Sequence, residues 1–262
     1  MKAVDADRAD SLPGRRLKAD ETFQFACRPD LACFNRCCRN LNLFLYPYDV
    51  LRLKRRLGMT ADQFLDAYTD LVLRPGRSFP DVLLRMTDNA AQTCPFVSPE
   101  GCTVYPDRPF TCRSFPLEKG LALGAAGTRP EPVFFLNPPP FCLGPRQPQP
   151  TTAKEWFAEA DTRRYDRFTE RWALVQDRFG RGDPWGAEGP RGRRAKMAFM
   201  ATYNLDAFRR FVFESSFLQR FKVPRERLRR MEGEDEALLE LGLAWIEWIL
   251  LGIRSADLRP RR

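Results

Sequence analysis

The sequence predicts an α+β fold, with an irregular cysteine-rich metal-binding domain of short strands and two helices followed by an all-α C-terminal block. Two observations lead to this prediction. All eight cysteines of the 262-residue chain lie before residue 143, among short apolar runs broken by Pro and Gly. After Pro150, aromatic residues instead recur at helical spacing. We therefore expect a flexible tail over 1–22, a cysteine-cluster domain over 23–150 and a helical region over 151–262.

The N-terminal segment predicts the cellular setting. Residues 1–22 are charged, contain Pro and Gly and show no periodicity, and they lack an apolar stretch of the kind found in secretory signals. We therefore expect a cytoplasmic, reducing environment, where cysteines are more often metal ligands or redox groups than disulfides. The most apolar stretch, 237–253, is short and is interrupted by Glu240 and Glu247, so it predicts a buried helix and no membrane span.

The cysteine-rich part predicts short elements in a fixed order. Irregular backbone over 23–38 leads into an apolar strand or helix approach over 41–46. A helix then runs to Gly58, and a second helix begins with a Thr60 to Gln63 capping box. We expect these two helices to support the cysteine loop. The later elements are a strand over 81–87, a hairpin over 94–106, strands at 121–124 and 133–136, and a Pro-rich linker over 137–150.

The C-terminal part predicts helices throughout. A Thr152 to Glu155 capping box opens one long amphipathic helix that continues to about residue 179. After a Gly- and Pro-rich loop, helical patterns cover 193–201, 205–221, 224–231 and 234–252. The Phe residues at 208, 211, 213, 217 and 221 are more typical of a helix core than of a nucleic-acid stacking platform. We expect this region to bind a protein partner.

The cysteine spacing predicts a thiolate metal site, because the chain contains no histidine. No CxxC pair occurs, which weakens a zinc-knuckle interpretation, and the radical-SAM pattern fails because its third position would be Asn40. Eight thiolates suffice for two four-thiolate centres, and clusters accept ligands from distant loops, so iron–sulfur is favoured over zinc. The expected metal ligands are Cys27, Cys33, Cys37, Cys38, Cys94, Cys102, Cys112 and Cys142.

The positive charge leaves two interpretations open. Net charge is +9, from 36 arginines and 7 lysines against 34 acidic residues. Arginines close to cysteines could offset the charge of a thiolate centre or could simply be solvated; they are Arg28, Arg36, Arg39, Arg108 and Arg113. Basic runs at 191–194, 225–230 and 259–262 would suit nucleic acid, although a solvated helix face explains them better.

The segment CPFVSPEGCTVYPDRPFTCRSFP, residues 94–116, resembles the signature of the YkgJ-type cysteine-cluster proteins. CFNRCC at 33–38, followed by the helices of 47–68, is also similar to that family. The Cys27 to Cys33 interval is wider than the family's compact C-x3-C-x2-C-C form. The resemblance covers about residues 23–145 and implies a zinc- or iron-chelating domain, often with an iron–sulfur cluster and without an assigned reaction.

Two alternatives to an iron–sulfur protein stay open. One is a structural zinc-binding adaptor. The other is an enzyme of protein modification, because a related cysteine arrangement is found in the flagellin lysine methylases. Against the enzyme interpretation, the chain has no Gly-rich methyl-donor loop of the GxGxG kind, and motif searching gives no nucleophile, base or cofactor loop beyond the thiols.

Overall fold

The chain folds into two compact units that are each built from two stretches of sequence. A computed structural model describes residues 1, 3–6, 12–125, 128–255 and 258–261. The first unit combines Met1–Phe44 with Leu84–Leu174, and the second combines Leu45–Leu83 with Val175–Arg262. The predicted α+β class is confirmed, with helices dominating the C-terminal region. The units interleave in sequence, whereas the domains expected from the sequence were contiguous.

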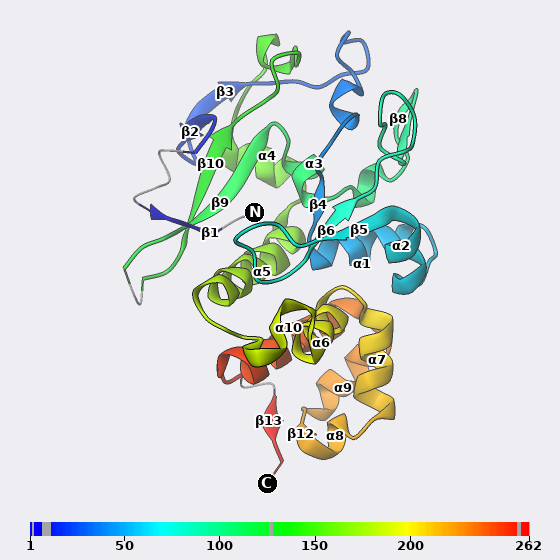
Figure 1. Cartoon of the computed structure of the whole chain (residues 1–262). Coiled ribbons are helices and arrows are strands. Elements are labelled where there is room, and N and C mark those ends of the chain that lie inside the picture. The colour runs from blue at the N-terminus through cyan, green and yellow to red at the C-terminus, as the bar shows by residue number, and fades with distance from the viewer. Residues whose placement is uncertain (2, 7–11, 126–127, 256–257, 262) are drawn as a thin grey trace. The chain divides into compact units, whose positions relative to one another are not determined.

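The first unit carries most of the strands (Figure 1). Its elements are β1 Ala3–Asp5, β2 Arg15–Leu17, β3 Thr22–Gln24, the 3₁₀ turn η2 Arg36–Cys38, β7 Val97–Ser98, β8 Gly101–Cys102, η3 Tyr105–Asp107, α3 Phe110–Ser114, β9 Leu117–Leu123, β10 Glu131–Leu136, η4 Gly144–Arg146, β11 Pro150–Thr152 and α4 Ala153–Glu159.

The second unit carries most of the helices. Its elements are α1 Pro47–Arg56, α2 Ala61–Tyr68, β5 Thr69–Val72, η5 Gly186–Arg191, α6 Arg193–Thr202, α7 Leu205–Glu214, α8 Phe217–Arg220, β12 Phe221–Lys222, α9 Arg225–Gly233, α10 Asp235–Leu251 and β13 Arg259–Pro260. Three elements lie where the chain passes from one unit to the other: β4 Phe44–Leu45, β6 Asp81–Leu84 and α5 Arg163–Arg181.

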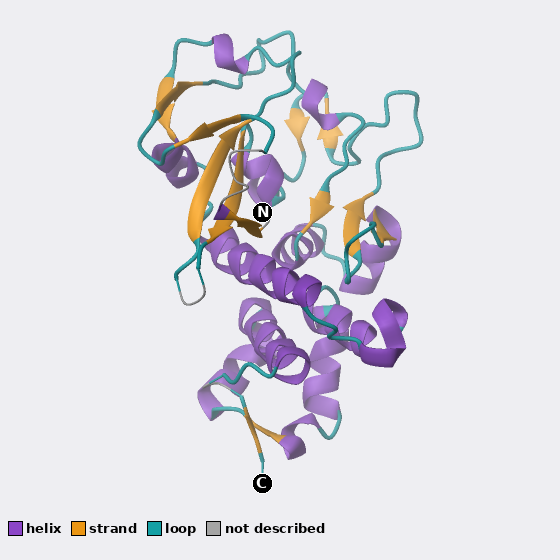
Figure 2. Ribbon diagram, turned by 60° about the vertical axis from the view of Figure 1, so that its left-hand side comes forward, coloured by secondary structure: helices purple, strands orange, loops and turns teal. Residues whose placement is uncertain are grey.

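The first unit contains a four-stranded sheet in the order β1-β9-β10-β2. Figure 2 draws its strands in orange. β9 and β10 are antiparallel, and Phe134 lies opposite Lys119. Phe134 contacts Phe157 of α4 with ring centroids 5.3 Å apart. Lys119 Nζ donates to Asp166 Oδ1 at 2.7 Å and to Glu170 Oε1 at 2.9 Å, both on α5. The sheet is therefore held to both helices by apolar packing and by an ion pair.

Residues 1–22, expected to be a flexible tail, contribute two edge strands to this sheet. β1 runs parallel to β9, and β2 is antiparallel to β10 with Leu17 opposite Phe134. Leu17 is 4% exposed. Each strand has only three residues and its partner lies more than 100 residues away, so local sequence carries little signal for it. Residues 2 and 7–11 of the expected tail lie outside the described residues.

The long helix predicted from residue 152 is divided into α4 and α5. Asp161 adopts the left-handed conformation, with φ of 49°. Thr162 Oγ1 donates to the carbonyl of Phe157 at 3.1 Å and contacts Asp166 Oδ2 at 2.7 Å, so its side chain stabilises a break between the helices. The pattern predicted over 205–221 likewise ends early, because Ser215 closes α7 by donating to a carbonyl of the preceding turn.

The predicted buried helix over 237–253 is confirmed as α10. Gly242 lies against α6, and a Cβ there would be 2.0 Å from the carbonyl oxygen of Ala201. Glycine therefore permits the close approach of the two helices. Trp245 stacks on Phe208 of α7 at 5.7 Å, which confirms a core role for the Phe cluster. Among the described residues, no helix combines the length and apolarity needed to cross a membrane.

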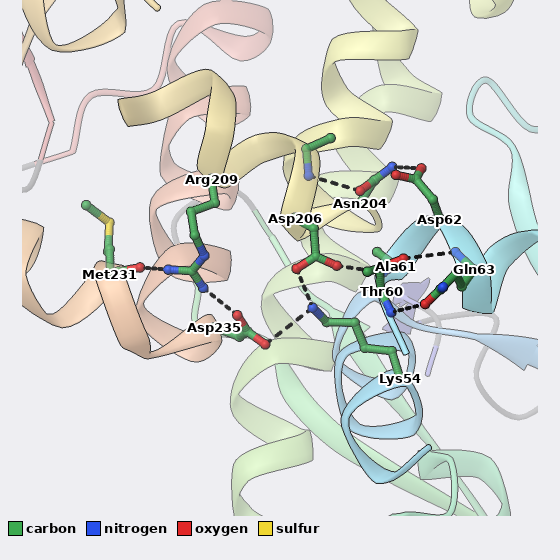
Figure 3. Close-up of polar contacts among 11 residues, drawn as sticks. Lys54, Thr60, Ala61, Asp62, Gln63, Asn204, Asp206, Arg209, Met231 and Asp235 are labelled. Carbon is green, nitrogen blue, oxygen red and sulfur yellow. Dashed lines mark hydrogen bonds and ion pairs between the residues drawn. The ribbon is translucent and has the colours of Figure 1, made fainter. Parts of the chain in front are cut away.

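Helices α1 and α2, expected to support the cysteine loop, belong to the second unit and contact α10 and α7 there. Their ends share a buried ionic network (Figure 3). Lys54, 5% exposed, donates from Nζ to Asp206 Oδ1 at 2.8 Å and lies 3.5 Å from Asp235 Oδ2. Asp206 accepts from the backbone N–H of Ala61 at 2.6 Å, and Asp235 pairs with Arg209 at 2.5 Å.

The network is favourable because each charge lies at the helix end that stabilises it. The Lys54 ammonium is near the C-terminus of α1, whereas Asp206 and Asp235 occupy the first turns of α7 and α10. Burial opposes ionisation of Asp206, but the hydrogen bonds from Lys54 and Ala61 and the charges of Lys54 and Arg209 together outweigh it and lower the pKa of that carboxyl. The network therefore ties four helices of the second unit together.

Replacing Lys54 with Met should destabilise the protein by about 3 kcal/mol, because the partly buried Asp206 and Asp235 would lose their shared cation and only Asp235 would keep another, Arg209. The measurement is the free energy of unfolding from urea titration. Lys222→Met is the matched control, since Lys222 is exposed on β12 and its loss should change stability by about 0.5 kcal/mol or less. Equal stability of both variants would show that the network contributes nothing.

Candidate metal centre

All eight cysteines lie in the first unit, and all are free thiols. They occupy loops, turns and short elements rather than long strands or helices. Cys27 is exposed and Cys33 is buried, whereas the remaining six are partly buried. The chain therefore collects its soft ligands in one compact unit, although they are spread over more than 110 residues of sequence.

The segment before Cys27 lies alongside the Pro-rich segment that contains Cys142. β3 and β11 are antiparallel, with Gln24 opposite Pro150. The backbone N–H of Phe25 donates to the Gln149 carbonyl at 3.0 Å, and that of Ala26 donates to the Gly144 carbonyl at 3.2 Å. The pairing thus continues past the strand ends toward the two cysteines.

Gly144 packs directly against the ring of Phe25. A Cβ at residue 144 would lie 2.2 Å from the Phe25 ring, so no larger residue fits without moving the ring. Phe25 is 1% exposed and contacts Trp156 and Phe115 edge-on, at centroid distances of 5.4 and 5.8 Å. An aromatic cluster therefore fixes the backbone just before Cys27 against the backbone just after Cys142.

Cys33 lies beside the residue that follows Cys142. The backbone N–H of Leu143 donates to Cys33 Sγ at 3.3 Å, and burial, followed by the nearby thiols of Cys33 and Cys37, raises the pKa of Cys142. The guanidinium of Arg36 lies 4.9 Å from the centre of the Phe141 ring. Turn η2 is thereby held against the Pro-rich loop.

Backbone hydrogen bonds join η2 to the hairpin that carries the central cysteines. The N–H of Cys94 donates to the carbonyl of Cys38 at 2.8 Å. Asn35, at φ of 60°, donates from Nδ2 to the carbonyl of Ser98 at 3.1 Å. The predicted hairpin is confirmed as β7 and β8, with Val97 opposite Cys102. Cys94 and Cys102 therefore both lie at the open end of the hairpin.

Cys112 lies on the short helix α3, next to the buried Arg113. Arg113 is 6% exposed and donates to the carbonyls of Ala160 (2.7 Å) and Pro106 (2.5 Å). Its guanidinium also lies 4.5 Å from the centre of the Tyr165 ring. Among the described residues, no carboxylate pairs with it, so a buried positive charge adjoins this cysteine. The solvated interpretation of the arginines therefore fails at Arg113.

Arg108 lies between Cys102 and Cys112 in the sequence. Its guanidinium stacks 3.8 Å from the centre of the Tyr105 ring and donates to the Tyr105 carbonyl at 2.8 Å. Burial is the main cause that lowers the pKa of Arg108, and the thiols of Cys112 and Cys102 act in the opposite direction. Opposite charges would therefore attract here once these thiols ionise.

The thiol pKa values show which cysteines influence one another. Burial, followed by Cys37, Cys142 and Cys33, raises the pKa of Cys27 to about 11. Hydrogen bonding to Cys38, followed by burial, raises the pKa of Cys37. Thiols held protonated in this way need a strong competing cation, such as a soft metal ion, before they ionise at neutral pH.

The same coupling appears in the hairpin. Burial is the main cause that raises the pKa of Cys94, and the Cys102 thiol raises it further. Burial also raises the pKa of Cys102 itself. Across the described residues, however, no three Cys, Asp or Glu side chains come close enough together to hold a single metal ion. The loops of the first unit bring the cysteine segments together, but the thiols do not surround a single point in space.

Sequence reasoning identified the thiols but missed the residues that position them. Gly144 packs against Phe25 and so joins two segments that carry cysteines, and the guanidinium of Arg36 lies over the ring of Phe141. The position of Gly144, two residues after Cys142, was the signal in the sequence for such a contact, because glycine often marks a close approach of the backbone. The partner ring cannot be inferred from spacing alone.

Comparison with known proteins gives one match. Residues 26–143 match a family model described as "putative zinc- or iron-chelating domain". No curated protein and no solved structure matches the chain.

Replacing Gly144 with Ala should lower the melting temperature, because the added methyl group displaces the buried Phe25 ring; overpacking of this kind costs about 1–3 kcal/mol. The measurement is thermal unfolding of metal-free protein. Gly180→Ala is the matched control, since a Cβ there meets no neighbouring atom and alanine favours the helix. A melting temperature that Gly144→Ala leaves unchanged would contradict the close contact.

Proposed function

We propose that the first unit holds one or two iron–sulfur clusters through cysteine thiolates alone, because residues 26–143 match the model of the CxxCxxCC family of zinc- or iron-chelating domains. The observation that carries this proposal is the gathering of eight free thiols in one unit of a chain without histidine. Thiolate ligation selects zinc, copper(I) and iron–sulfur clusters among biological metals.

The donor set fits a thiolate-bound metal. The cysteines lie on loops and short turns, where side chains can rotate toward a common centre as metal binds. Such rotation is needed, because the thiols are gathered but not closed around one ion. Metal binding would then also stabilise the loops, as in other domains where ligation is coupled to folding.

Ligand spacing favours iron–sulfur over zinc. The eight thiols come from separate segments around η2, the β7–β8 hairpin, α3 and the Pro-rich loop, and none forms a CxxC turn. Structural zinc sites usually take two ligands from such a turn, whereas a cluster accepts ligands from distant loops.

A bound cluster supplies one-electron transfer, and the surrounding residues tune its potential. Arg113 would place a buried positive charge beside Cys112, and Arg108 would do so between Cys102 and Cys112. Both cations would offset the negative charge of thiolates. The free thiols also suit the reducing cytoplasm that we propose as the compartment.

The proposal is tested by anaerobic purification followed by assays of iron and acid-labile sulfide, with electron paramagnetic resonance of the reduced protein. We expect a brown protein with iron and sulfide in equal amounts. Cys112→Ser should lower bound iron, whereas Thr111→Ser, an exposed neighbour on α3, should not.

A colourless protein that holds stoichiometric zinc after anaerobic preparation would refute the iron–sulfur proposal and favour the structural zinc adaptor. Full iron content in Cys112→Ser would remove that cysteine from the ligand set.

A further inference from the structure

We propose that the eight thiols form two separate four-cysteine centres, divided between the adjacent residues Cys37 and Cys38. The first centre takes Cys27, Cys33, Cys37 and Cys142. The second takes Cys38, Cys94, Cys102 and Cys112. This inference rests on the proposed function, and it assigns to each centre the ligands that the fold brings together.

The first centre is defined by contacts between the N-terminal loop and the Pro-rich loop. The Leu143 N–H donates to Cys33 Sγ at 3.3 Å, so Cys33 lies beside the residue that follows Cys142. Cys27 follows the backbone pairing of Ala26 with Gly144, at 3.2 Å. These contacts join residues separated by about 110 positions, so they reflect tertiary structure and not sequence proximity.

Cys37 belongs to the same group. Its thiol interacts electrostatically with both Cys27 and Cys142. The contact of Arg36 with the Phe141 ring, at 4.9 Å, holds turn η2 beside the Pro-rich loop. These contacts bring the segments that carry the four cysteines to one region of the first unit, where the side chains would turn toward one another as metal binds.

The second centre is defined by the β7–β8 hairpin and α3. Cys94 precedes β7 and Cys102 ends β8, so the antiparallel pairing brings them to the same end of the hairpin. Their thiols interact electrostatically. Arg108 interacts with both Cys102 and Cys112, which places α3 at that end.

Cys38 supplies the fourth ligand of the second centre. Its carbonyl accepts from the Cys94 N–H at 2.8 Å, and the next residue, Arg39, forms a β-bridge with Thr93. The backbone at Cys38 is thus paired with the segment that begins the hairpin, while Cys37 is coupled to the other group. Adjacent side chains in a turn project differently, so neighbouring cysteines can serve different centres.

The Cys37 to Cys38 junction brings the two centres together. Cys37 and Cys38 are consecutive residues of turn η2, and Cys38 is the main cause that raises the pKa of Cys37. Consecutive ligands in one turn would place two centres within a few bonds of each other, without an intervening protein layer. The arrangement suits electron exchange between two clusters, which a pair of independent structural metal sites would not require.

The test compares bound metal in wild-type protein, Cys142→Ser, Cys102→Ser and the double variant, by native mass spectrometry of anaerobically reconstituted protein. Two centres predict that each single variant loses about half of the bound metal and that the double variant loses all of it. Neither cysteine is fully buried, and circular dichroism of the metal-free proteins checks that both variants fold.

The division into two centres would be overturned if both single variants lost all of their metal, or if one single variant lost none. Either result would leave the proposed function in place. A wild-type chain that takes up no metal would refute the proposed function itself, and the two centres with it.

A second measurement needs no metal. Mild diamide oxidation of chelator-treated wild-type protein, followed by peptide mapping, should trap Cys33 with Cys142 and Cys94 with Cys102. Dominant cross-links between Cys142 and Cys102 would contradict the grouping.

Discussion

The pairing of β3 with β11 is the contact on which the cysteine site depends. It joins residues 22–24 to residues 150–152 and so closes a loop of more than 100 residues. Closing such a loop costs on the order of 4 kcal/mol of chain entropy. Burial of Phe23 and Phe25, at 3% and 1% exposure, contributes roughly 3–6 kcal/mol in the opposite direction. Apolar burial beside the strands can therefore hold Cys27 near Cys142 before any metal binds.

Electrostatics complements this packing. A buried arginine normally requires a carboxylate, yet Arg113 contacts two carbonyl oxygens and an aromatic ring, and its buried Nε has no hydrogen-bond partner among the described residues. Its charge is left available to the thiolates around Cys112. The second unit shows the contrasting solution, because Lys54 is neutralised by Asp206 and Asp235 within hydrogen-bond or ion-pair distance. The second unit thus neutralises Lys54 with its own carboxylates. The first unit instead keeps Arg113 next to Cys112, a candidate metal ligand.

The sequence predicted the elements that have strong local signals. The Thr60 capping box, the end of α1 before Gly58, the β7–β8 hairpin and the buried helix α10 were all found from spacing and turn residues. Local pattern could not reveal the strands at Ala3–Asp5 and Arg15–Leu17, because their partners are distant in sequence.

The break at Asp161 escaped prediction because the aromatic periodicity continues on both sides of it. The interleaved units could not be predicted either, since α1 and α2 follow the first cysteines in sequence but contact α10 and α7. For the candidate site, residue type and the absence of histidine indicated thiolate chemistry. Long-range contacts, such as that of Gly144 with Phe25, determine which cysteine segments come together. The spacing of cysteines along the sequence does not predict these contacts.

X-ray absorption spectroscopy of the metal-loaded protein tests the central claim most directly, because it reports which atoms surround the metal whatever the metal is. We predict a first shell of sulfur alone, at about 2.3 Å, with iron–iron scattering from a cluster. A first shell containing nitrogen or oxygen would contradict an all-cysteine centre.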